Sequence, residues 1–164
     1  MRNAHSTSSS QLSLTTLLTH KLYQSLIISC RRTYRGTLAR ISEVGFPLVF
    51  DIMRASHILV KHQGSRRTAS WKDTEGVEIK SRTKMDAINL LLDLKSKIYT
   101  EEDFAETATE YSDCGSARCG GDLGNFESGQ MMKPFEDATR SLRVGEISGI
   151  VDTDSGVHII LRTG

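Results

Sequence analysis

The fold is decided by the stretch Ile52-Met53-Arg54-Ala55-Ser56-His57-Ile58-Leu59-Val60. Most of its residues are apolar, and the run has the length of a single strand, so it predicts a buried β-strand. His57 is a polar member near the middle of this strand. We therefore expect an imidazole inside the folded part of the chain.

A basic loop follows the predicted strand directly, with the sequence Lys61-His62-Gln63-Gly64-Ser65-Arg66-Arg67. Arginine presents a planar fork of donors that matches phosphate oxygens, and lysine adds a compact positive charge. Lys61, Arg66 and Arg67 could therefore hold one anion together. The alternative is a basic turn that only faces water, which is the usual role of a charge run.

Two helices are predicted after this loop, which we expect to extend to about residue 82. Thr83 with Asp86, and Thr100 with Asp103, each have the spacing of a capping box at a helix start. Apolar residues recur at intervals of three and four behind each pair, as in amphipathic helices. The predicted buried faces are Ala87, Leu90, Leu91, Leu94 and Ile98 in the first helix, and Phe104, Ala105, Ala108 and Tyr111 in the second.

The remainder predicts a glycine-rich connection, a short helix and a hairpin. Residues 112–129 contain closely spaced glycines and favour an irregular segment with a short strand near 123–126. Pro134 is suited to the first turn of a helix. Residues 147–153 and 157–161 flank an Asp-Ser-Gly turn and predict an antiparallel hairpin. The order of elements indicates an α+β domain over 51–164.

Residues 1–50 differ in composition from this domain. They are rich in serine, threonine and arginine, and Glu43 is the first acidic residue. An organellar transit peptide has this composition, but a disordered tail or a misassigned start, with Met53 as an internal start, would also explain it. We therefore expect a cytosolic and nuclear protein, or a mitochondrial or plastid one if the segment is a genuine transit peptide.

Charge and cysteine content narrow the function classes. The chain has net charge +1, and residues 1–52 carry six Lys or Arg against two acids, so they hold +4 and the remainder holds −3. A mildly acidic domain with one basic loop argues against nucleic-acid binding and favours a local anion site. Three cysteines fit a reducing compartment. No apolar run is long enough for a membrane span.

The motifs of residues 54–163 together resemble the parvulin peptidyl-prolyl isomerases, in particular the phosphorylation-dependent Pin-type branch. The landmarks are His57-Ile58-Leu59-Val60-Lys61-His62, Ser65-Arg66-Arg67, Ser70-Trp71, Ser112-Asp113-Cys114, Gly121-Asp122-Leu123-Gly124, Gly129-Gln130-Met131, Lys133-Pro134-Phe135-Glu136-Asp137-Ala138 and Thr153-Asp154-Ser155-Gly156-Val157-His158-Ile159-Ile160. Their joint order and spacing make the resemblance specific. It implies the parvulin-like, FKBP-like α+β fold, a four-stranded, mostly antiparallel sheet with three to four helices.

The resemblance also implies the roles of individual residues. The catalytic set would be His57, Cys114, Ser155 and His158, with Thr153 nearby. The proline pocket would be formed by Leu123, Met131 and Phe135, although apolar residues of this kind could equally be plain core. Lys61, Arg66 and Arg67 would bind the phosphate of a phosphoserine or phosphothreonine that precedes proline. The expected partners are phosphorylated Ser/Thr-Pro proteins, with no nucleic acid, no membrane, no metal and no cofactor, and the expected state is a monomer.

Some features depart from the family pattern or leave alternatives open. Met132 stands where relatives commonly have glutamine, Gly115 replaces a usual serine, and we expect no WW module. Cys114 with a histidine could instead serve a nucleophilic hydrolase, and with Cys119 it could suggest zinc, but the sequence has no oxyanion motif and no second ligand pair. A phospho-motif binding or chaperone-like module with little turnover is the alternative from another functional class.

Overall fold

The computed structural model describes residues 51–164. The predictions made for residues 1–50, a transit peptide or a disordered tail, lie outside this range. In residues 51–164, no helix is both long enough and apolar enough to cross a membrane.

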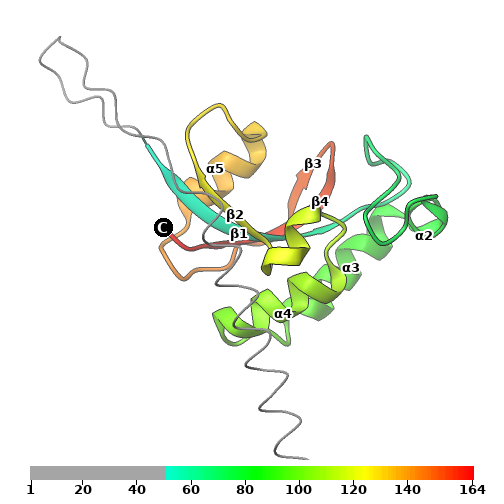
Figure 1. Cartoon of the computed structure of the whole chain (residues 1–164), viewed down its shortest axis with the longest axis horizontal. Coiled ribbons are helices and arrows are strands. Elements are labelled where there is room, and N and C mark those ends of the chain that lie inside the picture. Colours follow the sequence, from blue (N-terminus) through cyan, green and yellow to red (C-terminus); the bar gives the residue numbers. More distant parts are fainter. Residues whose placement is uncertain (1–50) are drawn as a thin grey trace, which may run out of the picture. The chain divides into compact units, whose positions relative to one another are not determined.

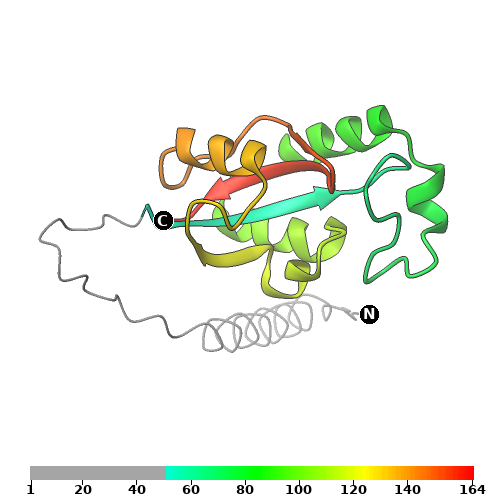
Figure 2. The ribbon, with the colours of Figure 1, turned by 90° about the horizontal axis from the view of Figure 1, so that it is seen from above.

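Four strands form one antiparallel sheet in the order β2-β1-β4-β3. Strand β1 spans Met53–Val60, β2 spans Asp122–Phe126, β3 spans Val151–Thr153 and β4 spans Gly156–Arg162. The first and last strands therefore pair at the centre, and Figure 2 shows them side by side with opposite directions. The predicted strand of residues 52–60 is confirmed to within one residue.

Helices cover both faces of the sheet. Side chains alternate between the two faces along each central strand, so both faces carry apolar residues that pack against helices. Ile58, Val60 and Ile159 pack in one apolar cluster with helices α3, Lys84–Lys95, and α4, Glu101–Tyr111. Met53 and Ile160 belong to a second cluster, with helix α5, Lys133–Ser141. Accordingly, α5 lies on the opposite side of the sheet from α3 and α4 (Figure 1). The predicted α+β fold with a four-stranded antiparallel sheet is confirmed.

The predicted capping boxes are present at the starts of α3 and α4. Thr83 accepts a hydrogen bond from the Asp86 amide, and Thr100 accepts one from the Asp103 amide. Each aspartate carboxylate in turn accepts the amide of its threonine. These reciprocal bonds satisfy N–H groups that a helix leaves unpaired in its first turn.

Replacing Thr100 by alanine is expected to lower the free energy of unfolding by about 1 kcal/mol, because the Asp103 amide loses its acceptor. Denaturant titration would measure this change. Thr100→Ser is the matched control, since it keeps the hydroxyl, and should retain most of the stability. Equal losses in the two variants would contradict a capping role.

Three details differ from the sequence-based expectation. The loop before residue 82 contains a short helix, α2, Val77–Ser81, whose first amides bond the Asp73 carboxylate. The glycine-rich segment contains a 3-10 helix, η1, Gly115–Cys119. The first arm of the hairpin is only three residues long, since the Ser148 hydroxyl accepts the Ile160 amide and interrupts the regular pairing.

Candidate functional site

Two histidines meet on the α5 face of the central strand pair. His57 comes from β1 and His158 from β4, and their Nδ1 atoms are 3.1 Å apart. The rings stack with centroids 5.2 Å apart. The outer nitrogens also have partners: His57 Nε2 lies 3.1 Å from Ser116 Oγ, and His158 Nε2 lies 2.8 Å from Thr153 Oγ1. The site therefore contains a continuous chain of polar contacts from Ser116 to Thr153.

Both imidazoles are held neutral by their surroundings. Burial lowers the pKa of His57 from 6.5 to about 4. Burial, and secondarily the repulsion of a charged His57, lowers the pKa of His158 to about 3. Because both rings are neutral, each has one N–H donor and one acceptor, as an ordered hydrogen-bond chain requires.

Acidification is expected to destabilise the fold through this pair. Each histidine has a lower pKa folded than unfolded, so below pH 6.5 the unfolded state binds more protons. The free energy of unfolding should therefore fall by about 1.4 kcal/mol per pH unit and per histidine, from about pH 6.5 down to the folded-state pKa values. Ring nitrogen chemical shifts at pH 5.5 should show that His57 and His158 are both neutral. Titration of His57 or His158 near pH 6.5 would contradict this prediction.

The three residues predicted to hold a proline ring belong to one apolar group, and one of them, Phe135, contacts both histidines. Phe135 presents its ring edge-on to His57 and to His158, with centroid distances of 5.6 Å in both cases. Leu123 and Met131 are half-buried and pack against the same cluster as Phe135. Phe135 itself is buried. The arrangement combines a core aromatic with two partly exposed apolar side chains at the edge of the polar chain.

Cys114 and Ser155 lie at a cavity whose lining does not include the histidine pair, and the Ser155 amide reaches the pair through Thr153. Both residues line this cavity, and both are partly exposed. Cys114 has a free thiol. In the part of the chain that the structure describes, no hydrogen bond joins this thiol to either histidine. Since Ser116 and His158 occupy the two ring nitrogens of His57, this ring is not placed as a base for Cys114, as a hydrolase would require.

Ser155 and Met132 connect the cavity to the apolar cluster. The Ser155 hydroxyl donates to the Met132 sulfur over 3.7 Å, and the Ser155 amide donates to Thr153 Oγ1 over 3.2 Å. A thioether is a weak acceptor. The hydroxyl can therefore turn toward a better acceptor at little cost.

The cavity has a volume of about 470 Å³ and brings the three predicted anion-binding cations together. Lys61, Arg66 and Arg67 all line it, with Cys114 and Ser155 at the same wall. Arg66 and Arg67 are exposed, and within residues 51–164 their guanidinium groups have no hydrogen bond or ion pair. Their donors are therefore free for a bound anion.

Lys61 differs from the two arginines because it is buried and already bonded. Its ammonium donates to the Ala69 carbonyl, and its main-chain amide donates to Asp113 Oδ2 over 2.9 Å. The pKa of Lys61 is lowered, mainly by burial and also by Arg67, against the opposing attraction of Asp113. An anion placed between Lys61 and Arg67 would offset both unfavourable effects.

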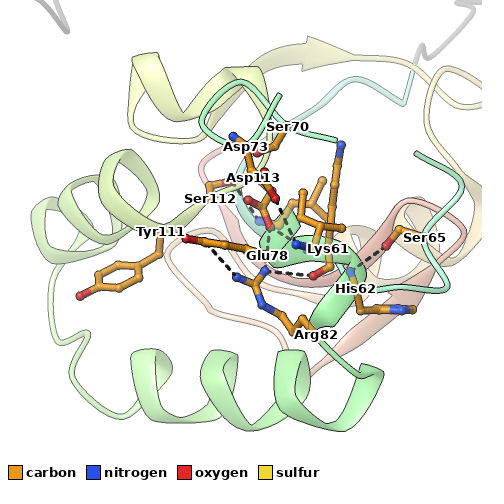
Figure 3. A network of polar contacts seen from close by, with 12 residues as sticks. Lys61, His62, Ser65, Ser70, Asp73, Glu78, Arg82, Tyr111, Ser112 and Asp113 are labelled. Carbon is orange, nitrogen blue, oxygen red and sulfur yellow. Dashed lines mark hydrogen bonds and ion pairs between the residues drawn. The ribbon is translucent and has the colours of Figure 1, made fainter. Parts of the chain in front are cut away.

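Polar residues that sequence reasoning did not single out support this site. Ser116 contacts His57, and the buried Glu136 accepts the amides of Gly129 and Met131 over 2.8 and 2.9 Å. Asp113 is almost fully buried and contacts Arg82 (Figure 3). Asp113 and Glu136 lie inside the quoted family landmarks, but the sequence offered no spacing signal for their partners. Those partners become evident only when the chain folds.

Comparison with known proteins connects this geometry to a family. Residues 57–164 match the family model described as Rotamase, the PPIC-type PPIASE domain. Two curated proteins named peptidyl-prolyl cis-trans isomerase Pin1 are similar to the chain. The one from Arabidopsis thaliana is 59% identical over 114 residues, which cover 69% of this chain and 96% of the relative. The one from Digitalis lanata is 58% identical over 113 residues, covering 68% and 96%.

A solved structure agrees with these matches. The solution structure of TbPIN1 is 51% identical in sequence and superposes with a TM-score of 0.61, covering 69% of this chain and 97% of that chain. The two chains therefore share their fold.

Proposed function

Because the chain belongs to the PpiC-type rotamase family and is a Pin-type parvulin, a peptidyl-prolyl cis-trans isomerase, we propose that it acts on bonds in which phosphoserine or phosphothreonine precedes proline. The observation that carries this proposal is the cavity in which Lys61, Arg66 and Arg67 converge next to Cys114. The expected partners are proteins phosphorylated at Ser/Thr-Pro sequences.

The cavity suits a phosphate in charge and in geometry. A phosphorylated side chain carries a charge of about −1.5 to −2 at pH 7 and three strong acceptor oxygens. The free guanidinium groups of Arg66 and Arg67 would supply paired donors, and the Lys61 ammonium a third positive charge. The phosphate belongs to the residue before proline, so this anchor would bring the following amide close to Cys114 and Ser155.

The reaction needs a site that binds the twisted amide better than the planar one. Rotation about an X-Pro bond has a barrier of about 18–20 kcal/mol because it breaks the conjugation of the amide. The group formed by Leu123, Met131 and Phe135 is proposed to hold the proline ring while the preceding carbonyl turns. Binding that is stronger in the twisted state lowers this barrier without a covalent intermediate.

The polar residues are proposed to stabilise the turning carbonyl. His57 and His158 are neutral, and Thr153 and Ser116 fix their ring positions through hydrogen bonds. Cys114 and Ser155 line the same cavity as the three cations, so a phosphate bound there would have the following amide beside them. A fixed set of dipoles costs no reorganisation when the amide twists.

A protease-coupled isomerisation assay tests the proposal with three peptides that differ only before proline. We expect phosphoSer-Pro to be turned over fastest, Glu-Pro more slowly and Ala-Pro slowest, in the order of negative charge. Equal rates on phosphoSer-Pro and Ala-Pro would refute phosphate specificity. Binding of the phosphopeptide without exchange would instead indicate the binding module that the sequence left open.

A further inference from the structure

A buried carboxylate stands at the base of the cationic cavity. Asp113 lines the cavity together with Lys61, Arg66 and Arg67, and its side chain is only 1% exposed. A negative charge there opposes the binding of an anion. A carboxylate in this position therefore requires a role that outweighs its electrostatic cost.

Two cations that do not line the cavity compensate this charge. Arg82 Nη1 lies 3.1 Å from Asp113 Oδ2, and Lys72 Nζ lies 3.7 Å from Oδ1. Each carboxylate oxygen thus faces one positive group. Because the Asp113 carboxylate is buried, loss of Arg82 would leave its charge poorly compensated.

Asp113 and Arg82 together hold the first residue of the basic loop. Asp113 Oδ2 accepts the Lys61 amide over 2.9 Å, and Arg82 Nη1 donates to the Lys61 carbonyl over 3.0 Å. Figure 3 shows Lys61, Arg82 and Asp113 as one connected group. Both main-chain groups of Lys61 are therefore fixed by this pair.

The Asp113 main chain and the neighbouring Ser112 side chain fix the segment that carries Cys114. The Asp113 amide donates to the Leu59 carbonyl over 2.7 Å, and the Leu59 amide donates to Ser112 Oγ over 3.1 Å. Ser112 Oγ also accepts the Cys114 amide over 3.3 Å. One residue thus stands between the anchor at Lys61 and the thiol at Cys114.

We propose that Asp113, paired with Arg82, is a positioning residue that couples phosphate binding at Lys61 to the placement of Cys114. The inference rests on the proposed function, because it requires a phosphate in the cavity. It implies that the phosphate raises kcat as well as lowering KM. Asp113 itself touches neither the phosphate nor the turning amide in this account.

Steady-state kinetics of Asp113→Asn and Arg82→Gln test the coupling. Asparagine keeps an acceptor for the Lys61 amide but loses the charge that holds Arg82. We expect kcat on a phosphoSer-Pro peptide to fall about fivefold to tenfold, while kcat on Ala-Pro changes less than about twofold. Equal losses on both peptides would show a merely structural role and overturn the proposal.

The exposed pair of Asp93 and Lys97 offers a control in the same molecule. Asp93→Asn removes one carboxylate from an ion pair and should leave both rates unchanged. If Asp113→Asn does not fold, as judged by its unfolding transition, Arg82→Gln carries the same comparison. An unchanged kcat on phosphoSer-Pro in a folded Arg82→Gln would also overturn the proposal.

Amide NMR with inorganic phosphate tests two things separately, the coupling through Asp113 and the existence of the phosphate site. In the unaltered protein, phosphate should shift the amides of Lys61, Arg66, Arg67 and Cys114. In Asp113→Asn, we expect the basic loop to shift still and the Cys114 shift to shrink at least about twofold at saturation. A Cys114 shift that persists unchanged would be a direct effect and would overturn the coupling. No shift anywhere in the unaltered protein would refute the phosphate site itself.

Discussion

Replacing Arg66 and Arg67 together by alanine is expected to lower kcat/KM on a phosphoSer-Pro peptide by about 2 kcal/mol or more, which is about 30-fold. Both guanidinium groups line the cavity, so the variant removes the charge-assisted bonds proposed for the phosphate. Stability should change little, because within residues 51–164 neither side chain has a hydrogen bond or ion pair to lose. The protease-coupled assay on phosphorylated and unphosphorylated peptides measures the effect.

Arg143→Ala is the matched control for this experiment. Arg143 is also an exposed arginine, but it does not line the cavity, so its removal lowers the net charge by one without touching the site. It should retain full activity on both peptides. The phosphate anchor would be refuted if the double variant lost as much kcat/KM on Ala-Pro as on phosphoSer-Pro. Little change in kcat/KM on phosphoSer-Pro would also refute it.

Replacing Cys114 by alanine is expected to lower kcat on the phosphopeptide on the order of a hundredfold, while the affinity for the peptide changes less than about threefold. The thiol lies beside the cationic cavity, whereas the proposed phosphate contacts come from Lys61 and the arginines. Cys114 is half-buried and its thiol is free, so alanine leaves no buried partner unsatisfied.

Titration of labelled phosphopeptide, alongside the isomerisation assay, separates binding from turnover in this variant. Cys114→Ser keeps a small polar group and should recover part of the lost rate. A loss of affinity equal to the loss of rate would mean that Cys114 shapes the cavity and does not act on the amide.

Elements with local signals were predictable from the sequence. The starts of α3 and α4 are encoded by threonine–aspartate pairs three residues apart, and the structure has both capping boxes. Helix α2 has no such signal, because its first amides bond the side chain of Asp73 and its N-cap, Gly76, has a positive φ of 68°. Such a start depends on loop geometry that apolar periodicity does not reveal.

For the candidate site, the sequence motifs name individual residues but do not predict the contacts that join them. His57 and His158 were expected in one catalytic set, and the structure places their Nδ1 atoms 3.1 Å apart. The partner of His57 on the other side, Ser116, lies 59 residues away in sequence. Contacts of this kind depend on how a loop returns to a strand, which no local pattern specifies.

The central pairing of β1 with β4 also has a consequence for biosynthesis. His57 on β1 and His158 on β4 are 101 positions apart in the sequence. After β1 has emerged from the ribosome, it therefore lacks its main pairing partner until β4 has emerged as well. Until then, an apolar strand has an unpaired edge, the kind of surface that chaperones bind and that aggregates grow from. The order of the strands therefore leaves β1 open to such contacts for most of the time that the chain is being made.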